Sequence, residues 1–347
     1  MIIALLVAGI VSAIVVAMSR DFDLNYRRSA NSAIAEQTWA YLRGAEALVT
    51  LALIFDYEAD QLAGEPFKDD LTELWARGID PYPLEEGGFL GGFVLDLQGL
   101  FNLNSLVDAS GSGEGGAQNI GVSAFNSTQL QFVRLLQALP GVAVDQIEAR
   151  ALTEAIIDFL DADDEPRLNG AESSFYVAQN PSYRAANTEL SSVSELRSVA
   201  NMRPEVFEVL QHYVTVWPKD ASQINIHTAP GPVLRSLNPE NGADTPLDEA
   251  IVQNLLTRRN AQPFSGIDEF LAIDNFPGAE TTEPLRGLIT ERSSYFLLGT
   301  VVEIADRRQH MYSWVERDER DIRVLQRREA SPNEYLVSRS LIPEIPQ

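Results

Sequence analysis

Acidic side chains crowd one short stretch of the chain, DFLDADDEPRLNGAE at residues 158–172. Asp161 and Asp163 lie two positions apart, so they bring two carboxylates to one side of a turn. Gly170 permits a tight bend, and Glu172 closes the loop. Carboxylates this close repel one another unless a divalent cation lies between them, and calcium prefers oxygen ligands. Five acids fall within eight residues: Asp158, Asp161, Asp163, Asp164 and Glu165.

We therefore interpret residues 158–172 as a candidate calcium loop. The D-x-D-x-D-G spacing of an EF-hand is absent, so the loop is of another kind. The alternative interpretation is a solvated acidic helix end, which is what an acidic run usually is. Spacing alone leaves both interpretations open.

The residue types for other chemistries are scarce. The chain has no cysteine, which excludes disulfides, thiolate metal sites and cysteine nucleophiles. Its three histidines, His212, His227 and His310, are far apart and match no zinc pattern. No G-x-S-x-G elbow, dinucleotide fingerprint or Walker loop occurs. We expect no enzyme, and a membrane-anchored calcium-dependent hydrolase stays open only as the least supported alternative.

The net charge of −24 opposes binding to phosphate backbones, since 50 acidic residues face 26 basic ones. One segment, INIHTAPGPVL at 224–234, resembles the entry to a helix-hairpin-helix unit, a module that often grips DNA. We favour a structural interpretation, in which Ile224 and Ile226 enter the core and Thr228 caps a helix. We expect no nucleic-acid partner.

The N-terminal stretch is apolar enough to be a membrane helix. Residues 1–18, MIIALLVAGIVSAIVVAM, hold no charge and as a helix span roughly 27 Å, close to the hydrocarbon thickness of a bilayer. A cleaved secretory signal would have basic residues before this run and a small-residue cleavage site after it. Helical spacing continues to about Ile54, so we predict one helix of about 50 residues. A signal anchor followed by a separate helix is the alternative. The predicted amphipathic stripe is Leu24, Ala30, Ala33, Ile34, Tyr41, Leu42, Ala45 and Leu48.

The remaining chain alternates between helical and extended periods. A connector at 56–88 includes a short helical turn around 71–77, and 88–107 reads as a hairpin that turns at Gln98-Gly99. Residues 110–121 are of low complexity and mark a boundary. Seven or eight short helices follow, with caps predicted at Asp145, Ser192, Thr228, Thr245 and Ser265. Three strands separated by charged turns then form a meander.

These elements predict an α+β fold in which the long helix packs on an antiparallel sheet and a large all-helical domain is inserted into that sheet. The predicted parts are residues 1–18 in the membrane, 19–55 as the amphipathic part of the same helix, 56–125 as a first α/β segment, 126–290 as the helical domain, 291–330 as the meander and 331–347 as a tail.

Several blocks together resemble the K component of bacterial type II secretion systems, a large minor pseudopilin. The resemblance covers nearly the whole chain. Its residues are Met1–Met18, Asp96–Asn104, Ile156–Pro166, Gly170–Glu172, Tyr183–Asn187, Ser194–Arg197 and Ile224–Ala229. It implies a pilin-like fold in the inner membrane, with the bulk in the periplasm, that is extracted into the pseudopilus and occupies its tip. There it is expected to bind the I and J minor pseudopilins, to start fibre assembly and to support protein export across the outer membrane.

Two features of the N-terminus bear on this resemblance. Family precursors carry a short basic leader that ends in glycine, and the chain starts at Met1 without one, so either the numbering begins at the mature residue or the leader is missing. Most pilin-like proteins have glutamate at the fifth mature position, whereas K-type proteins lack it, and Leu5 stands here. A tip subunit has no neighbour above it for such a glutamate to meet.

The resemblance also implies calcium in the acidic region, since family members bind it there. The implied ligands are Asp161, Asp163 and Glu172, then Asp158, Asp164 and Asn187. A second function of a different class remains open, in which the helical domain recognises secreted proteins.

Overall fold

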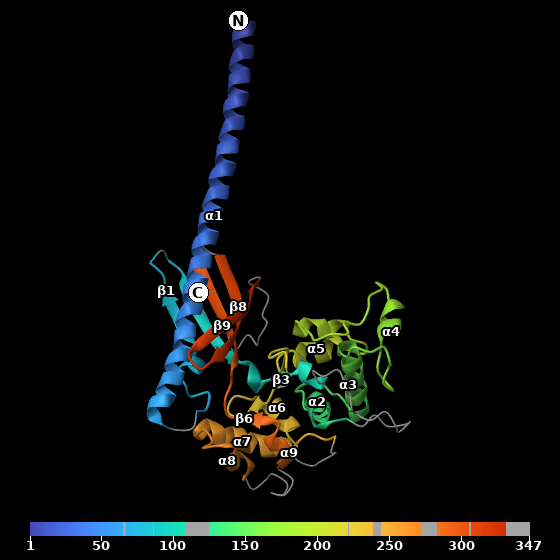
Figure 1. Cartoon of the computed structure of the whole chain (residues 1–347). Coiled ribbons are helices and arrows are strands. Elements are labelled where there is room, and N and C mark those ends of the chain that lie inside the picture. Colours follow the sequence, from blue (N-terminus) through green and yellow to red (C-terminus); the bar gives the residue numbers. More distant parts are fainter. Residues whose placement is uncertain are drawn as a thin grey trace.

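The computed structural model describes residues 1–64, 67–85, 87–107, 125–220, 222–238, 244–272, 283–304 and 307–330. The low-complexity boundary predicted at 110–121 and the tail at 331–347 lie outside these residues. The part described has three components: a long helix, a sheet against its lower half, and a mostly helical domain beside and below the sheet (Figure 1).

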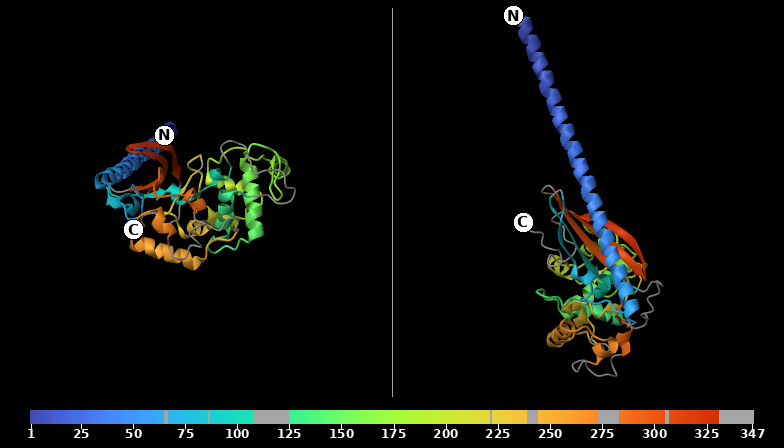
Figure 2. Two further views of the ribbon diagram at one scale, coloured as in Figure 1. Left: turned by 60° about the horizontal axis from the view of Figure 1, so that its bottom comes forward. Right: turned by 90° about the vertical axis from the view of Figure 1, so that its left-hand side faces the viewer.

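The first helix, α1 (Ile2–Ala63), is one continuous element of 62 residues. It is longer than the predicted 50 residues, because it contains no proline and ends only at Gly64, which adopts the left-handed conformation (φ 68°) that ends a helix. Its upper half projects free of the fold in the right-hand view of Figure 2. An 18-residue window in α1 has a mean hydropathy of 2.8 and no buried residue, so α1 is long and apolar enough to cross a membrane.

Five strands form one antiparallel sheet in the order β1-β2-β7-β8-β9. Neighbouring strands β2 and β7 pair from Phe89–Glu303 to Asp96–Phe296, yet residues 97–294 separate them in sequence. The helical domain is therefore inserted between two adjacent strands. The strands are β1 (Ile79–Pro83), β2 (Phe89–Asp96), β7 (Tyr295–Ile304), β8 (Arg307–Asp318) and β9 (Asp321–Ala330).

The predicted C-terminal meander is confirmed by β7, β8 and β9, and Glu319 (φ 54°) lies in the predicted turn between the last two. The other predicted turn, at 306–307, falls partly outside the described residues. The hairpin predicted at 88–107 is wrong. After β2 the chain forms a 3-10 turn, η2 (Leu97–Gly99), and β3 (Phe101–Asn102) then pairs in parallel with β4 (Val214–Thr215) of the insertion.

Helix α1 packs on the sheet through a stripe that begins at Thr38. Leu42 and Ala45 cluster with Val302 and Met311, and the next turns cluster with Phe296 and Val315. Of the predicted stripe, Leu42 and Ala45 enter this core and the half-buried Tyr41 packs against it, whereas Leu24 and Leu48 are exposed. The predicted stripe starts too early in the chain, because the sheet covers only the lower half of the helix. The buried set is Thr38, Leu42, Ala45, Glu46, Val49, Leu53, Asp56 and Tyr57.

Glu46 of α1 forms a buried ion pair with Arg327 of the sheet. Glu46 is 5% exposed and accepts hydrogen bonds from Ser313 (2.6 Å) and from Arg327 Nε (2.7 Å). Burial raises the pKa of Glu46, but these hydrogen bonds outweigh it and hold the pKa below its usual range.

We expect Glu46→Gln to lower the free energy of unfolding by about 1–3 kcal/mol, because hydrogen bonds to a charged group are lost. Since the folded-state pKa is depressed, this contribution is present above the ordinary glutamate pKa and is lost as pH falls. Urea unfolding at pH 7 and pH 3 measures it. Glu36→Gln, at an exposed position of the same helix, is the matched control. Equal effects of both substitutions at pH 7 would contradict the assignment.

The insertion consists of short helices around one continuous core. Two small parallel pairings also occur, β3 with β4 and β5 with β6, so the domain is not all-helical. Its core already includes Phe101, Leu103 and Leu106, which places the predicted boundary at 126 too late. The connector before β1 contains the short helix η1 (Trp75–Arg77). The other elements of the insertion are η3 (Leu103–Leu106), α2 (Ser127–Gln137), α3 (Gln146–Leu160), α4 (Ser173–Val177), η4 (Val193–Ser198), α5 (Pro204–Leu210), β5 (Ile224–Asn225), α6 (Gly231–Ser236), α7 (Glu249–Ala261), α8 (Ile267–Leu271), α9 (Glu283–Arg286) and β6 (Ile289–Thr290).

Two of the predicted helix caps are confirmed. Asp145 accepts from Glu148 N, and Ser192 forms a capping box with Glu195. The other three predictions are wrong: α6 and α7 begin after Pro230 and Asp248, and α8 begins after Gly266 without a side-chain cap. In place of capping, Ser265 donates to Glu269, and the Thr228 hydroxyl donates to Asp96.

Asp96 stands where the sheet joins the insertion. Its side chain is 3% exposed and accepts four hydrogen bonds. The donors are Gln98 N (2.8 Å), Thr228 Oγ1 (2.5 Å), Ser293 Oγ (2.7 Å) and Asn225 Nδ2 (3.1 Å). One carboxylate thereby ties the end of β2, the start of β7 and the β5 segment together.

Candidate calcium site

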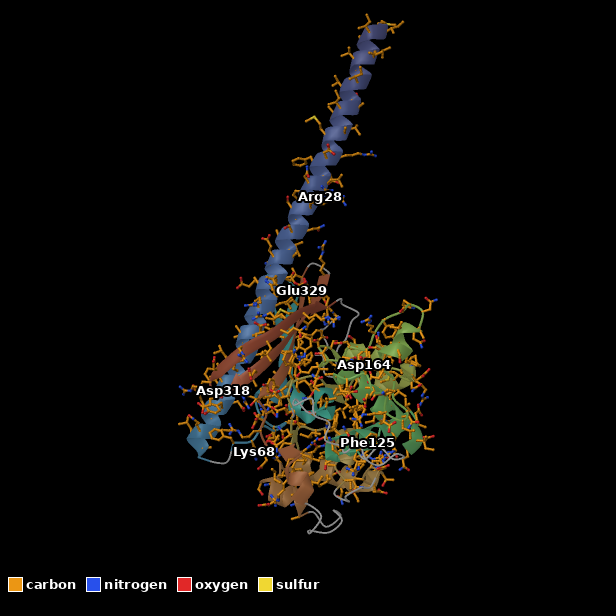
Figure 3. All side chains as sticks on the ribbon, turned by 45° about the vertical axis from the view of Figure 1, so that its right-hand side comes forward. Arg28, Lys68, Phe125, Asp164, Asp318 and Glu329 are labelled. Carbon is orange, nitrogen blue, oxygen red and sulfur yellow. The ribbon has the colours of Figure 1, made fainter. Side chains whose placement is uncertain are left out.

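The acidic loop lies between α3 and α4 at the side of the insertion away from α1, where Figure 3 labels Asp164. Asp158 belongs to the last turn of α3, Asp161 follows as its C-terminal cap, and Glu172 precedes α4. Asn187 approaches from a later segment: its backbone N–H donates to Phe159 O (3.0 Å) and its side-chain amide donates to Asp163 O (2.9 Å). Two helix ends and one loop thus converge.

The structure brings most of the predicted ligands together. Asp161, Asp163 and Glu172 each offer a carboxylate oxygen, and these oxygens all lie within 4.8 Å of one another. Five oxygen atoms of the site are buried without a hydrogen-bond partner: Asp158 Oδ1, Asp161 Oδ1, Glu172 Oε1, Glu172 Oε2 and Asn187 Oδ1. Buried acceptors are nearly always satisfied in folded proteins, so five such oxygens in one place form a donor set that a cation could satisfy.

Gly170 has a specific role beside Asp158. A Cβ at position 170 would lie 1.9 Å from Asp158 Oδ2, so only glycine allows this close approach. Asp158 Oδ2 accepts from Arg167 N (3.0 Å), and Arg167 Nε lies 3.5 Å from Asp158 Oδ1. The loop backbone therefore holds this buried carboxylate in place.

The electrostatics of the loop are unfavourable without a cation. Burial, together with the neighbouring carboxylates, raises the pKa of Asp161 and of Glu172 to about 7. Burial raises the pKa of Asp158 to about 6, although the Arg167 backbone and charge oppose the rise. Near neutral pH the loop holds more negative charge than its surroundings compensate.

The residues present fit calcium. The donor set consists of carboxylate and amide oxygens only, which suits a hard cation with six to eight oxygen ligands. Asp158, Asp161, Asp163, Glu172 and Asn187 would hold it. The sixth predicted ligand, Asp164, is exposed and lies outside this group.

Sequence analysis missed a second acidic group, Asp56, Asp69 and Glu73, whose carboxylate oxygens also lie within 4.8 Å of one another. Arg317 occupies it: Nη1 lies 3.3 Å from Asp56 Oδ2, and Nη2 pairs with Asp69. Burial and the neighbouring acids raise the pKa of Glu73 to about 9. A guanidinium and a proton therefore offset two of the three negative charges of this group. The three acids come from α1 and the connector, and Arg317 comes from β8. In the sequence, only the adjacent acids Asp69 and Asp70 point to this group.

Comparison with known proteins places this chain in a family. Two family models, both described as type II secretion system protein K, match residues 99–219 and 224–291. Type II secretion system protein K of Pseudomonas aeruginosa is 31% identical over 91% of this chain and 87% of its own length. The Aeromonas hydrophila protein is 32% identical over 90% of both chains. The chain belongs to the type II secretion system protein K family.

A solved structure supports this membership. A chain in the crystal structure of the GspK-GspI-GspJ complex from the enterotoxigenic Escherichia coli type 2 secretion system covers 88% of this chain and 99% of itself, with a TM-score of 0.71 and 25% identity. Both the predicted family and the predicted α+β fold with an inserted helical domain are confirmed. Protein K is a minor pseudopilin, so this chain is a structural component of protein secretion.

Proposed function

We propose that this chain occupies the tip of the periplasmic pseudopilus, where it binds the I and J minor pseudopilins and starts fibre assembly. The observation that carries the proposal is the likeness to a protein K chain solved together with two other minor pseudopilins. Residues 1–18 anchor the chain in the inner membrane before extraction, and the sheet and insertion lie in the periplasm.

An exposed stripe on α1 is the proposed contact with the partner helices. Leu48, Leu51, Phe55 and Leu62 recur at i, i+3, i+7 and i+14 and are 58%, 45%, 57% and 89% exposed. They lie on one side of the helix, turned away from the sheet-facing Leu42, Val49 and Leu53. The partner we propose is a helix of the I or J pseudopilin, because an apolar stripe left exposed on one helix face suits packing against a second helix.

Phe55→Glu is expected to weaken binding to the I and J pseudopilins by at least about tenfold, because it places a charge in an apolar contact. Pull-down of purified I and J proteins at graded concentrations measures the change. Ile147→Glu, at an apolar residue of α3 in the insertion that is 81% exposed, is the matched control and leaves binding unchanged. If the two variants bind equally well, α1 is not the contact.

Fibre initiation needs a test in cells. In a secreting strain that lacks its own K protein, this chain should restore both pseudopili and export, with I and J present. Restored export without any pseudopili would contradict the initiation role.

We also propose that the loop at 158–187 binds a structural calcium ion through Asp158, Asp161, Asp163, Glu172 and Asn187. Five orphan oxygens support this assignment. Bound calcium supplies positive charge that orders the loop and takes no part in a reaction.

Recognition of secreted proteins is a second candidate function. Phe175, Val177 and Tyr183 of the α4 segment are exposed beside the calcium loop. Capture of secreted enzymes by residues 21–347 without I and J, lost in Phe175→Ser, would support it.

A further inference from the structure

A small polar cavity lies between the connector after α1 and the end of α7. Its volume is about 260 Å³, room for a few water molecules or one small polar group. Figure 3 labels Lys68 close by, near the base of α1. The lining residues are Asp70, Leu71, Thr72, His227, Arg259, Asn260 and Pro263.

Two lining residues carry buried polar atoms that bond to nothing. His227 is 0% exposed, and neither ring nitrogen has a hydrogen-bond partner. Arg259 is 8% exposed; its Nη1 donates to Ile226 O (3.1 Å) and Ala229 O (2.7 Å), but its Nε donates to nothing. No carboxylate of the described residues forms an ion pair with Arg259, although a buried charge without a partner is costly.

The nearby acids are engaged elsewhere. Asp70 Oδ1 accepts from Thr72 N (2.7 Å) and Thr72 Oγ1 (2.6 Å), and Asp70 Oδ2 faces Lys68 Nζ at 3.6 Å. Glu291 Oε1 lies 3.7 Å from His227 Nε2, beyond hydrogen-bond distance.

Glu269, the other acid that acts on His227, pairs with Arg258. Burial lowers the pKa of His227 to about 4, with Lys68 and Arg259 adding to the effect and Asp70 opposing it. The ring is therefore neutral at pH 7, with one donor and one acceptor nitrogen.

We infer that this cavity binds a carboxylate group between Arg259 and His227, from either a small organic acid or an acidic side chain of another protein. A carboxylate at the cavity would offset the buried guanidinium charge. It would accept from Arg259 Nε–H and from an imidazole N–H once the side chains that cover these buried atoms move aside. The exposed Asn260 at the cavity offers an amide donor for the second oxygen. None of these residues belongs to the calcium loop or the α1 stripe.

The test uses the full chain in detergent with isotope-labelled histidine, since only three histidines occur. Acetate added at constant ionic strength, with chloride as the reference, should shift the His227 ring resonance saturably and leave His212 and His310 unchanged. A blocked Gly-Glu-Gly peptide is the second probe. A response to acetate alone identifies a small acid as the occupant, and a response to the peptide identifies a protein side chain.

The variants separate binding from folding. Arg259→Gln should abolish the shift, whereas Arg320→Gln, at an exposed arginine between β8 and β9, should leave it intact. Because Arg259 also bonds two backbone oxygens, Asn260→Ala provides a variant with no structural bonds to lose and should weaken binding about tenfold. A His227 resonance that responds to neither probe overturns the inference, as does unchanged affinity in Asn260→Ala.

Discussion

Chelating calcium is expected to lower the melting temperature of the chain by about 5 °C. A ligand at 100 times its dissociation constant stabilises a fold by about 2.7 kcal/mol, and each kcal/mol is about 2–4 °C in chains of 150–250 residues. The reason is local: Asp161 and Glu172 hold buried oxygens with no other partner. Thermal unfolding in millimolar calcium and in chelator measures the difference.

The double substitution Asp161→Asn with Glu172→Gln should remove this dependence. In chelator it should also melt above the unsubstituted chain, because two mutually repelling charges are gone. Asp164→Asn is the matched control, since Asp164 is an exposed acid of the same loop. The calcium site is contradicted if the melting temperature still depends on calcium in the double substitution, or if it no longer does so in the control.

The same site predicts a dependence on pH. The folded pKa of Asp161 and of Glu172 is raised to about 7, so without calcium the folded state binds protons more tightly than the unfolded state. Stability in chelator therefore falls as pH rises from about 4 to about 7. Protons compete with calcium, so the gap between the two melting temperatures should be small at pH 5 and largest at pH 8. A gap that does not change with pH would contradict this account.

Asp96→Ala is expected to lower the free energy of unfolding by about 3–5 kcal/mol, because several buried donors lose their shared acceptor. Asn225, Thr228 and Ser293 all donate to Asp96 Oδ2. Urea unfolding measures the loss. The effect should extend beyond the sheet, since this carboxylate ties the insertion to it.

The matched control for Asp96 is Asp318→Ala, at the exposed end of β8 (Figure 3). It should change the free energy of unfolding by less than about 0.5 kcal/mol. A loss below 1 kcal/mol in Asp96→Ala would show that the joint between sheet and insertion does not depend on this carboxylate.

The loop at 158–172 could be predicted from sequence because its residues are close in the chain. Asp161, Asp163 and Glu172 lie within twelve positions, and their types alone indicate a hard cation. Asn187 came only from the family resemblance, since nothing local links it to the loop. Likewise, the close approach that requires Gly170 becomes visible only in three dimensions.

Long-range polar contacts could not be predicted. Asp56, Asp69, Glu73 and Arg317 meet across up to 261 positions, and no pattern in the chain pairs them. Thr228 was expected to cap a helix, but its hydroxyl donates to the distant Asp96. The predicted hairpin failed for the same reason, since β3 finds its partner in β4 across the insertion.

The most direct test of the tip role is size-exclusion chromatography with light scattering on residues 21–347, mixed with the soluble parts of the I and J pseudopilins. The truncation is justified because the fold leaves residues 1–29 of α1 exposed. The account predicts a 1:1:1 complex in calcium that weakens or dissociates in chelator. Separate elution of all three proteins in both conditions would contradict it.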